Sequence, residues 1–137
     1  MSETKRILVI DDSQVMLERI QRALVDAGYD VTATTQIVGN ARYLASCDLL
    51  IIDYHMPGLN GDSVVESLRT SAHSTKNKSQ LFLYTSDEKV ASNYRALGFD
   101  GAFWGKGDES VLVRQVAALF RTLAMRAAIG RQGGTSS

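Results

Sequence analysis

Short apolar runs alternate with amphipathic segments along the chain. Two of these runs, residues 7–10 and 49–52, are aliphatic without polar alternation, which is typical of strands covered on both faces of a sheet. After the first run, apolar residues recur at helical spacing at Met16, Ile20 and Leu24. By the same criteria, further strands are expected at 29–34, 81–84 and 102–104, and further helical segments around 37–45, 64–68, 90–97 and 112–123.

Five strands alternating with helices predict a doubly wound α/β fold, with helices on both faces of a five-stranded parallel sheet. Right-handed crossovers leave few topologies. We expect the flavodoxin-like order 2-1-3-4-5, which places the two aliphatic runs at the centre. Residues 5–125 are expected to form this single (βα)5 domain. Residues 126–137 are a C-terminal extension, predicted to be a mobile tail because it has no core-forming residues from Gly130 onward.

Composition narrows the classes of function. The length of 137 residues suits one domain, and 15 basic against 15 acidic residues give no net charge to attract nucleic acid or an acidic membrane. The lone Cys47 excludes an internal disulfide and a multi-cysteine zinc site, and is expected to be a small buried apolar residue. No apolar run reaches the roughly 18 residues of a membrane span, and residues 1–6 show no secretory signal. A cytoplasmic location without membrane insertion is therefore expected.

Polar residues follow four of the expected strands. Asp11 and Asp12 come after the first strand, Asp53 after the third, Thr85 after the fourth and Lys106 after the fifth. In a sheet of this order, ligands bind outside the carboxyl ends of the strands, where the strand order reverses. Three carboxylates, a hydroxyl and an ammonium are therefore expected to meet at one edge of the sheet.

Such a cluster calls for a cation. Carboxylates a few ångströms apart repel each other, and one of them would otherwise take up a proton. Mg²⁺ prefers hard oxygen ligands and uses one or two carboxylates together with phosphate oxygens. One of the carboxylates can then act as a nucleophile and carry an aspartyl phosphate. The pattern indicates phosphoryl transfer, which depends mainly on positioning and charge neutralisation.

The order and spacing of these residues match a known sequence pattern. Asp11-Asp12, the stretch Asp53-Tyr-His-Met-Pro-Gly-Leu-Asn-Gly61, Thr85-Ser86 and Phe103-Trp-Gly-Lys106 resemble the response-regulator receiver domain of two-component signalling over residues 5–125. The resemblance implies that Asp53 is the phosphoacceptor. It also implies a Mg²⁺ site in which Asp12 and Asp53 bind the metal directly, Asp11 acts through water and the backbone carbonyl of His55 completes the ligands.

The resemblance also implies a switch. Lys106 would pair with the phosphoryl group, Thr85 would move toward a phosphoryl oxygen and the aromatic Phe103 would turn inward. The face built from the fourth helix, the fifth strand and the fifth helix would then change its partners. His55 could tune the lifetime of the phosphorylated state by controlling water access, or be an exposed loop histidine.

The implied function is a signalling module rather than a classical enzyme. A histidine kinase or phosphotransfer protein would donate the phosphoryl group, and a downstream effector protein would bind the altered face. No nucleic-acid binding by this domain is expected, and homodimer formation is left open. A degenerate receiver that acts without phosphate is the main alternative. A phosphatase of the haloacid dehalogenase type is a distant one, because it needs Asp-x-Asp after the first strand.

Several residues allow another interpretation. Asp12-Ser13 could simply cap the first helix, and Trp104 is expected in the core because side chains alternate along a strand. The family usually has proline after the lysine, but this chain has Gly107. A cis bond to a residue other than proline costs about 3 kcal/mol, so we expect a trans and looser connection after Lys106.

Overall fold

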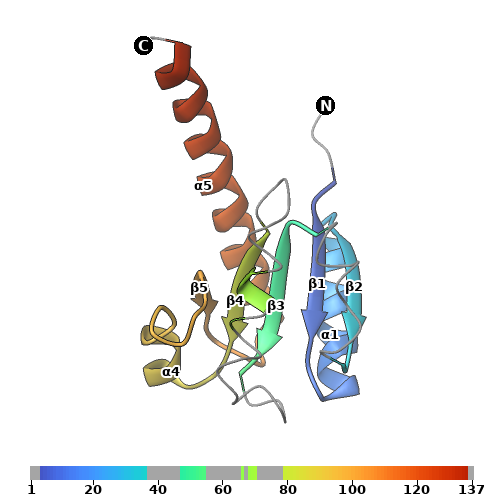
Figure 1. Cartoon of the computed structure of the whole chain (residues 1–137). Helices are drawn as coiled ribbons and strands as arrows, with labels where there is room; N and C mark the ends of the chain where they lie inside the picture. Colours follow the sequence, from blue (N-terminus) through green and yellow to red (C-terminus); the bar gives the residue numbers. More distant parts are fainter. Residues whose placement is uncertain (1–3, 37–46, 55–65, 67, 71–78, 136–137) are drawn as a thin grey trace.

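The computed structural model describes residues 4–36, 47–54, 66, 68–70 and 79–135. Five parallel strands form one sheet in the order β2-β1-β3-β4-β5 (Figure 1). This order confirms the predicted doubly wound topology. The strands are β1 (Arg6–Ile10), β2 (Asp30–Thr34), β3 (Leu49–Asp53), β4 (Gln80–Tyr84) and β5 (Gly101–Phe103).

The register of the sheet sets which residues share its carboxyl edge. Ile10 lies opposite Ile52, Asp53 lies opposite Tyr84, and Tyr84 lies opposite Phe103. The arrowheads of β1, β3 and β4 accordingly point to the same edge in Figure 1. The residues that directly follow these strands therefore lie next to one another at the carboxyl edge of the sheet.

Two apolar cores lie on the two faces of the sheet. On one face, Leu17, Ile20 and Leu24 of α1 (Gln14–Asp26) pack with Leu112 and Val116 of α5 (Glu109–Thr135) against inward side chains of the strands. On the other face, α4 (Glu88–Ser92) and the turns after it contribute partly buried apolar residues, and the predicted burial of Cys47 is confirmed. The continuous aliphatic character of β1 and β3 reflects burial on both faces.

Of the two residues that could cap the first helix, Ser13 forms the cap of α1. The Oγ of Ser13 accepts a hydrogen bond from the backbone N–H of Met16 at 3.2 Å, which satisfies one of the unpaired donors of the first turn. Ser13 therefore caps the helix, and the Asp12 carboxylate is not needed for capping.

The C-terminal helix is longer than the sequence pattern indicated. α5 continues to Thr135, through most of the extension for which a tail was expected, and runs past the edge of the sheet opposite the arrowheads (Figure 1). The helix passes Gly130 because a glycine weakens a helix by about 1 kcal/mol without ending it. Mobility of residues 126–137 stays a prediction. Within the part of the chain that the structure describes, no helix combines the length and apolar character needed to cross a membrane.

The placement of Trp104 in the core was wrong. β5 ends at Phe103, so the alternation of side chains does not extend to the next residue. The Trp104 side chain is 59% exposed, beside the loop that leads to α5.

Candidate functional site

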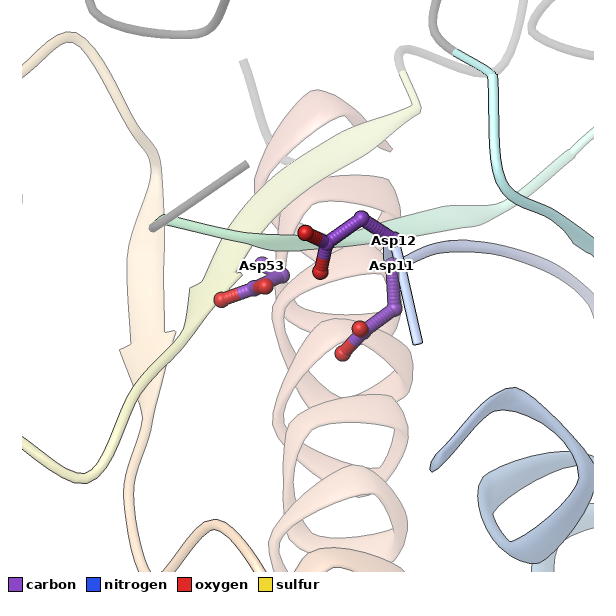
Figure 2. A group of neighbouring side chains, drawn as sticks. All are labelled: Asp11, Asp12 and Asp53. Carbon is purple, nitrogen blue, oxygen red and sulfur yellow. The ribbon is translucent and has the colours of Figure 1, made fainter. Parts of the chain in front are cut away.

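Three carboxylates gather at the carboxyl ends of β1 and β3 (Figure 2). One carboxylate oxygen from each of Asp11, Asp12 and Asp53 lies within 4.8 Å of the others. Asp11 and Asp53 are buried, whereas Asp12 is exposed. Asp11 Oδ1 also accepts a hydrogen bond from the N–H of Ser13 at 2.9 Å, so the turn into α1 fixes its orientation.

Lys106 joins this cluster from the loop after β5. Its Nζ lies 2.9 Å from Asp11 Oδ2 and 2.9 Å from Asp53 Oδ1, and its side chain is only 16% exposed. Burial lowers the pKa of Lys106, but its hydrogen bonds to Asp11 and Asp53 outweigh burial and raise it overall. The ammonium therefore stays charged between the two carboxylates. The sequence pattern placed Lys106 at this edge of the sheet but did not predict these two contacts.

The donor set fits a hard divalent cation. Three carboxylates face one ammonium, so negative charge remains in excess. Oxygen ligands of this kind suit Mg²⁺, and such a cation would relieve the repulsion among the carboxylates. Asp11, Asp12 and Asp53 are the residues that would hold it. His55, the predicted carbonyl ligand, lies outside the described residues. Its part in metal binding and its tuning of the phosphorylated state stay predictions.

Thr85 lies at the same edge, directly after the residue that pairs with Asp53. Its side chain is buried, and its Oγ1 accepts a hydrogen bond from the N–H of Asp87 at 3.0 Å. Its own N–H donates to the carbonyl oxygen of Phe103 at 3.3 Å. The hydroxyl is thus bonded within the turn before α4. Thr85 is the residue directly after β4, the strand that pairs with Asp53.

Phe103 is buried in the core between the sheet and α5. Its ring stacks on Phe82 with centroids 4.6 Å apart and planes at 30°, and the side chain is 2% exposed. Gly101 makes room for this stack, because a Cβ there would collide with the Phe82 ring. In this structure the predicted switch aromatic already faces inward, and its role in switching stays a prediction.

The loop that carries Lys106 has an uncommon backbone. Gly105 and Gly107 have φ values of 76° and 110°, a region that favours glycine. The Lys106–Gly107 bond is trans, as predicted. Proline fixes φ near −65°, so it cannot follow this path. Arg19 of α1 donates to the Gly107 carbonyl oxygen at 2.9 Å, and the expected looseness of the loop stays a prediction.

Sequence reasoning missed two groups beneath this loop, the ion pair of Arg19 with Glu109 and the hydroxyl of Tyr84. Tyr84 is 1% exposed, and its hydroxyl makes no hydrogen bond of normal geometry to the described residues. Burial raises the pKa of Tyr84 to about 12, a nearby backbone contact with Gly107 opposes this rise, and the charge of Glu109 adds to it. The available signal for Arg19 was its helical spacing from Met16 and Ala23, at the border of the apolar stripe.

Comparisons with known proteins agree with this arrangement. The chain matches the model of the response regulator receiver domain over residues 7–105. It is 30% identical over 128 residues to the transcriptional regulatory protein PcoR of Escherichia coli, covering 90% of this chain and 55% of PcoR. It is 29% identical over 118 residues to the CAI-1 autoinducer sensor kinase/phosphatase CqsS of Vibrio cholerae, covering 83% of this chain and 17% of CqsS. The chain thus spans about half the length of PcoR and about a sixth of CqsS.

Solved structures show the same fold. The chemotaxis response regulator CheY4 of Vibrio cholerae superposes with a TM-score of 0.68 at 18% identity, covering 85% of this chain and 98% of CheY4. A CheY-like response regulator receiver domain protein from Methanospirillum hungatei JF-1 gives a TM-score of 0.71 at 16% identity, covering 90% and 99% of the two chains. The matched family model, the 2-1-3-4-5 sheet and the acidic pocket with its lysine agree. This chain belongs to the response regulator receiver domain family, a signalling module of two-component systems rather than a classical enzyme.

Proposed function

We propose that the protein is a switch gated by phosphorylation of Asp53, with Mg²⁺ as cofactor and a histidine kinase or phosphotransfer protein as donor. The observation that carries this proposal is the position of the Lys106 ammonium, 2.9 Å from Asp53 Oδ1 and 2.9 Å from Asp11 Oδ2. A cation held beside one buried carboxylate is placed to pair with charge that arrives on that carboxylate. The likeness to a transcriptional regulatory protein and to a sensor kinase/phosphatase supports this signalling setting.

The chemistry is a transfer from nitrogen to oxygen. A carboxylate oxygen of Asp53 forms a bond to phosphorus while the bond from phosphorus to the donor imidazole nitrogen breaks. The electron pair of the broken bond returns to the imidazole, and Asp53 carries an acyl phosphate. Bound Mg²⁺ supplies neutralisation of the phosphoryl oxygens.

The residues of this chain divide the remaining tasks. Asp11 and Asp12 would hold the cation beside Asp53, and Lys106 would transfer its contact from the Asp53 carboxylate to a phosphoryl oxygen. The Thr85 hydroxyl would then turn from the N–H of Asp87, to which it is now bonded, toward the phosphoryl group. This movement couples the pocket to α4, because Asp87 caps that helix.

The output would be a change of the face formed by α4, β5 and α5, which then binds an effector protein. Moving an equilibrium from 99:1 to 1:99 takes about 5.5 kcal/mol of differential interaction. A phosphoryl group carries a charge of almost −2 and accepts several hydrogen bonds, which is sufficient for such a change when Thr85 and Lys106 both bind it.

The test is intact mass after incubation with Mg²⁺ and a small phosphoramidate donor. The wild-type protein should gain the mass of one phosphoryl group, and Asp53→Asn should not. Asp48→Asn is the matched control, because Asp48 lies just before β3 and its carboxylate is bonded to the N–H of Arg6, away from the pocket. A wild-type protein that gains no phosphoryl group would favour the alternative, a receiver that binds its partner without phosphate.

A second measurement tests the role of Thr85. Thr85→Ala should still be phosphorylated, but phosphorylation should no longer change the fluorescence of the single tryptophan, Trp104, beside α5. Loss of phosphorylation itself in Thr85→Ala would show that the assigned role is wrong.

A further inference from the structure

Arg19 reaches from α1 to the loop that carries Lys106. Its Nη2 donates to the Gly107 carbonyl oxygen at 2.9 Å and to Glu109 Oε2 at 3.0 Å, and its Nε lies 2.5 Å from Glu109 Oε1. These contacts join residues 88 and 90 positions apart in the sequence. The guanidinium therefore connects α1 both to the loop after β5 and to the first residue of α5.

Glycine on both sides of Lys106 restrains the backbone of this loop less than other residues would. Lys106 lies between two glycines with positive φ, and neither glycine has a side chain that could pack against the protein. A hydrogen bond from the N–H of Asp108 to the carbonyl oxygen of Gly105 closes the turn at 3.0 Å. Arg19 binds the carbonyl oxygen of Gly107, the residue directly after Lys106. The contact therefore restrains the backbone that sets the direction of the Lys106 side chain.

The pair combines one hydrogen bond with an ion pair. Arg19 Nη2 donates to Glu109 Oε2, and the positive Nε side of the rigid, planar guanidinium lies against Oε1 without a hydrogen bond of normal geometry. The Glu109 side chain is only 17% exposed, whereas that of Arg19 is 51% exposed at a groove between α1 and the start of α5. Glu109 lies in the first turn of α5, so the anchor holds the loop at the point where it becomes a helix.

We infer that Arg19 is a positioning residue for Lys106: by binding the Gly107 carbonyl oxygen and the Glu109 carboxylate, it holds the flexible Gly-Lys-Gly loop so that the ammonium reaches Asp53. In this chain the anchor takes the place of the rigidity that a proline after the lysine would give. The inference rests on the proposed function, because it assigns Lys106 to the phosphoryl group. It adds a residue from a different element to that assignment.

The first test measures the rate of Asp53 phosphorylation by phosphoramidate at fixed Mg²⁺. Arg19→Ala should slow this rate about tenfold, since small displacements of a positioned group cost up to about a hundredfold. Arg19→Lys keeps the charge but lacks the planar fork, so it should give an intermediate rate. Arg22→Ala is the matched control, because Arg22 lies one turn further along α1 and lines the same groove, and its rate should equal that of the wild type.

Two further measurements separate positioning from a general structural effect. In a Lys106→Ala background, Arg19→Ala should cause no additional slowing if it acts through Lys106. In the unphosphorylated protein, amide hydrogen exchange of residues 105–110 should rise in Arg19→Ala and stay unchanged in Arg22→Ala. An unchanged rate or unchanged exchange in Arg19→Ala, or equal slowing with and without Lys106, would overturn the inference. If wild-type Asp53 accepts no phosphoryl group, the proposed function fails, and the exchange measurement still decides whether Arg19 anchors the loop.

Discussion

The side chain of Gln115 binds both backbone groups of Trp104. Gln115 Oε1 accepts from the Trp104 N–H at 3.2 Å, and Gln115 Nε2 donates to the Trp104 carbonyl oxygen at 2.9 Å. β5 is the edge strand of the sheet and ends one residue earlier. The amide of α5 therefore replaces a neighbouring strand at this position, and it holds the exposed indole on the face that we propose to bind partners.

Gln115→Ala should weaken this connection between β5 and α5. We expect the free energy of unfolding to fall by about 1 kcal/mol, the usual contribution of one or two hydrogen bonds that water can partly replace. Urea unfolding followed by circular dichroism measures the loss. Gln115→Glu keeps the acceptor but not the donor and should lie between the two. A stability equal to that of the wild type in Gln115→Ala would show that the contact contributes nothing.

Gly107→Pro tests the path of the Lys106 loop. Although proline is the usual family residue at this position, its φ near −65° is incompatible with the 110° observed here. The substitution should therefore lower the free energy of unfolding by about 3 kcal/mol and slow phosphorylation of Asp53. Gly107→Ala is the control: a Cβ at this position meets no atom within 4 Å, so the strain at positive φ alone should cost about 1–2 kcal/mol. A proline variant as stable and as fast as the wild type would contradict the observed loop.

Removing a positive charge and removing a negative charge from the acidic cluster should change Mg²⁺ affinity in opposite directions. Lys106 is bonded to two carboxylates that the metal would share, so Lys106→Met should tighten Mg²⁺ binding, by roughly tenfold from the loss of one nearby positive charge. Asp53→Asn removes a negative charge and should weaken it by a similar factor. Isothermal titration calorimetry measures both. Lys89→Met, an exposed change on α4, should leave the affinity unaltered, and a shift of the same sign in both pocket variants would contradict the assigned metal site.

The sequence was informative where function depends on the ends of strands. Asp11, Asp53 and Lys106 could be placed together because parallel strands bring their carboxyl ends to one edge, and the aliphatic runs identified the central strands. That inference needs only the order of the strands. It does not require knowledge of any contact between side chains.

The same reasoning failed where one residue or one distant contact decides the outcome. Trp104 was assigned to the core because alternation was extended one residue past the end of a three-residue strand. The anchor formed by Arg19 depends on helix packing that brings together residues 88 positions apart, and no local pattern encodes that distance. Glycine at position 107 predicted a loose loop, which stays a prediction, but it gave no sign of the hydrogen bond that the loop accepts from Arg19.

Tyr84 gives a prediction about pH. Its buried hydroxyl has no hydrogen-bond partner of normal geometry among the described residues, so Tyr84→Phe should leave stability at pH 7 unchanged or raise it by up to about 1 kcal/mol. Burial raises the pKa of Tyr84 to about 12 in the folded protein, compared with about 10 in the unfolded chain. Between these values the unfolded state releases a proton that the folded state retains, so the contribution of this group to stability falls as the pH rises.

Wild-type protein should therefore lose stability between about pH 10 and pH 12 faster than Tyr84→Phe does. Unfolding in urea at a series of alkaline pH values measures the difference, and titration of tyrosinate absorbance follows the ionisation directly. The component that ionises near pH 12 should be absent from Tyr84→Phe. If the two proteins lose stability in parallel over this range, the Tyr84 hydroxyl is not held in the buried environment beneath the Lys106 loop. The packing of α5 against that loop would then need revision.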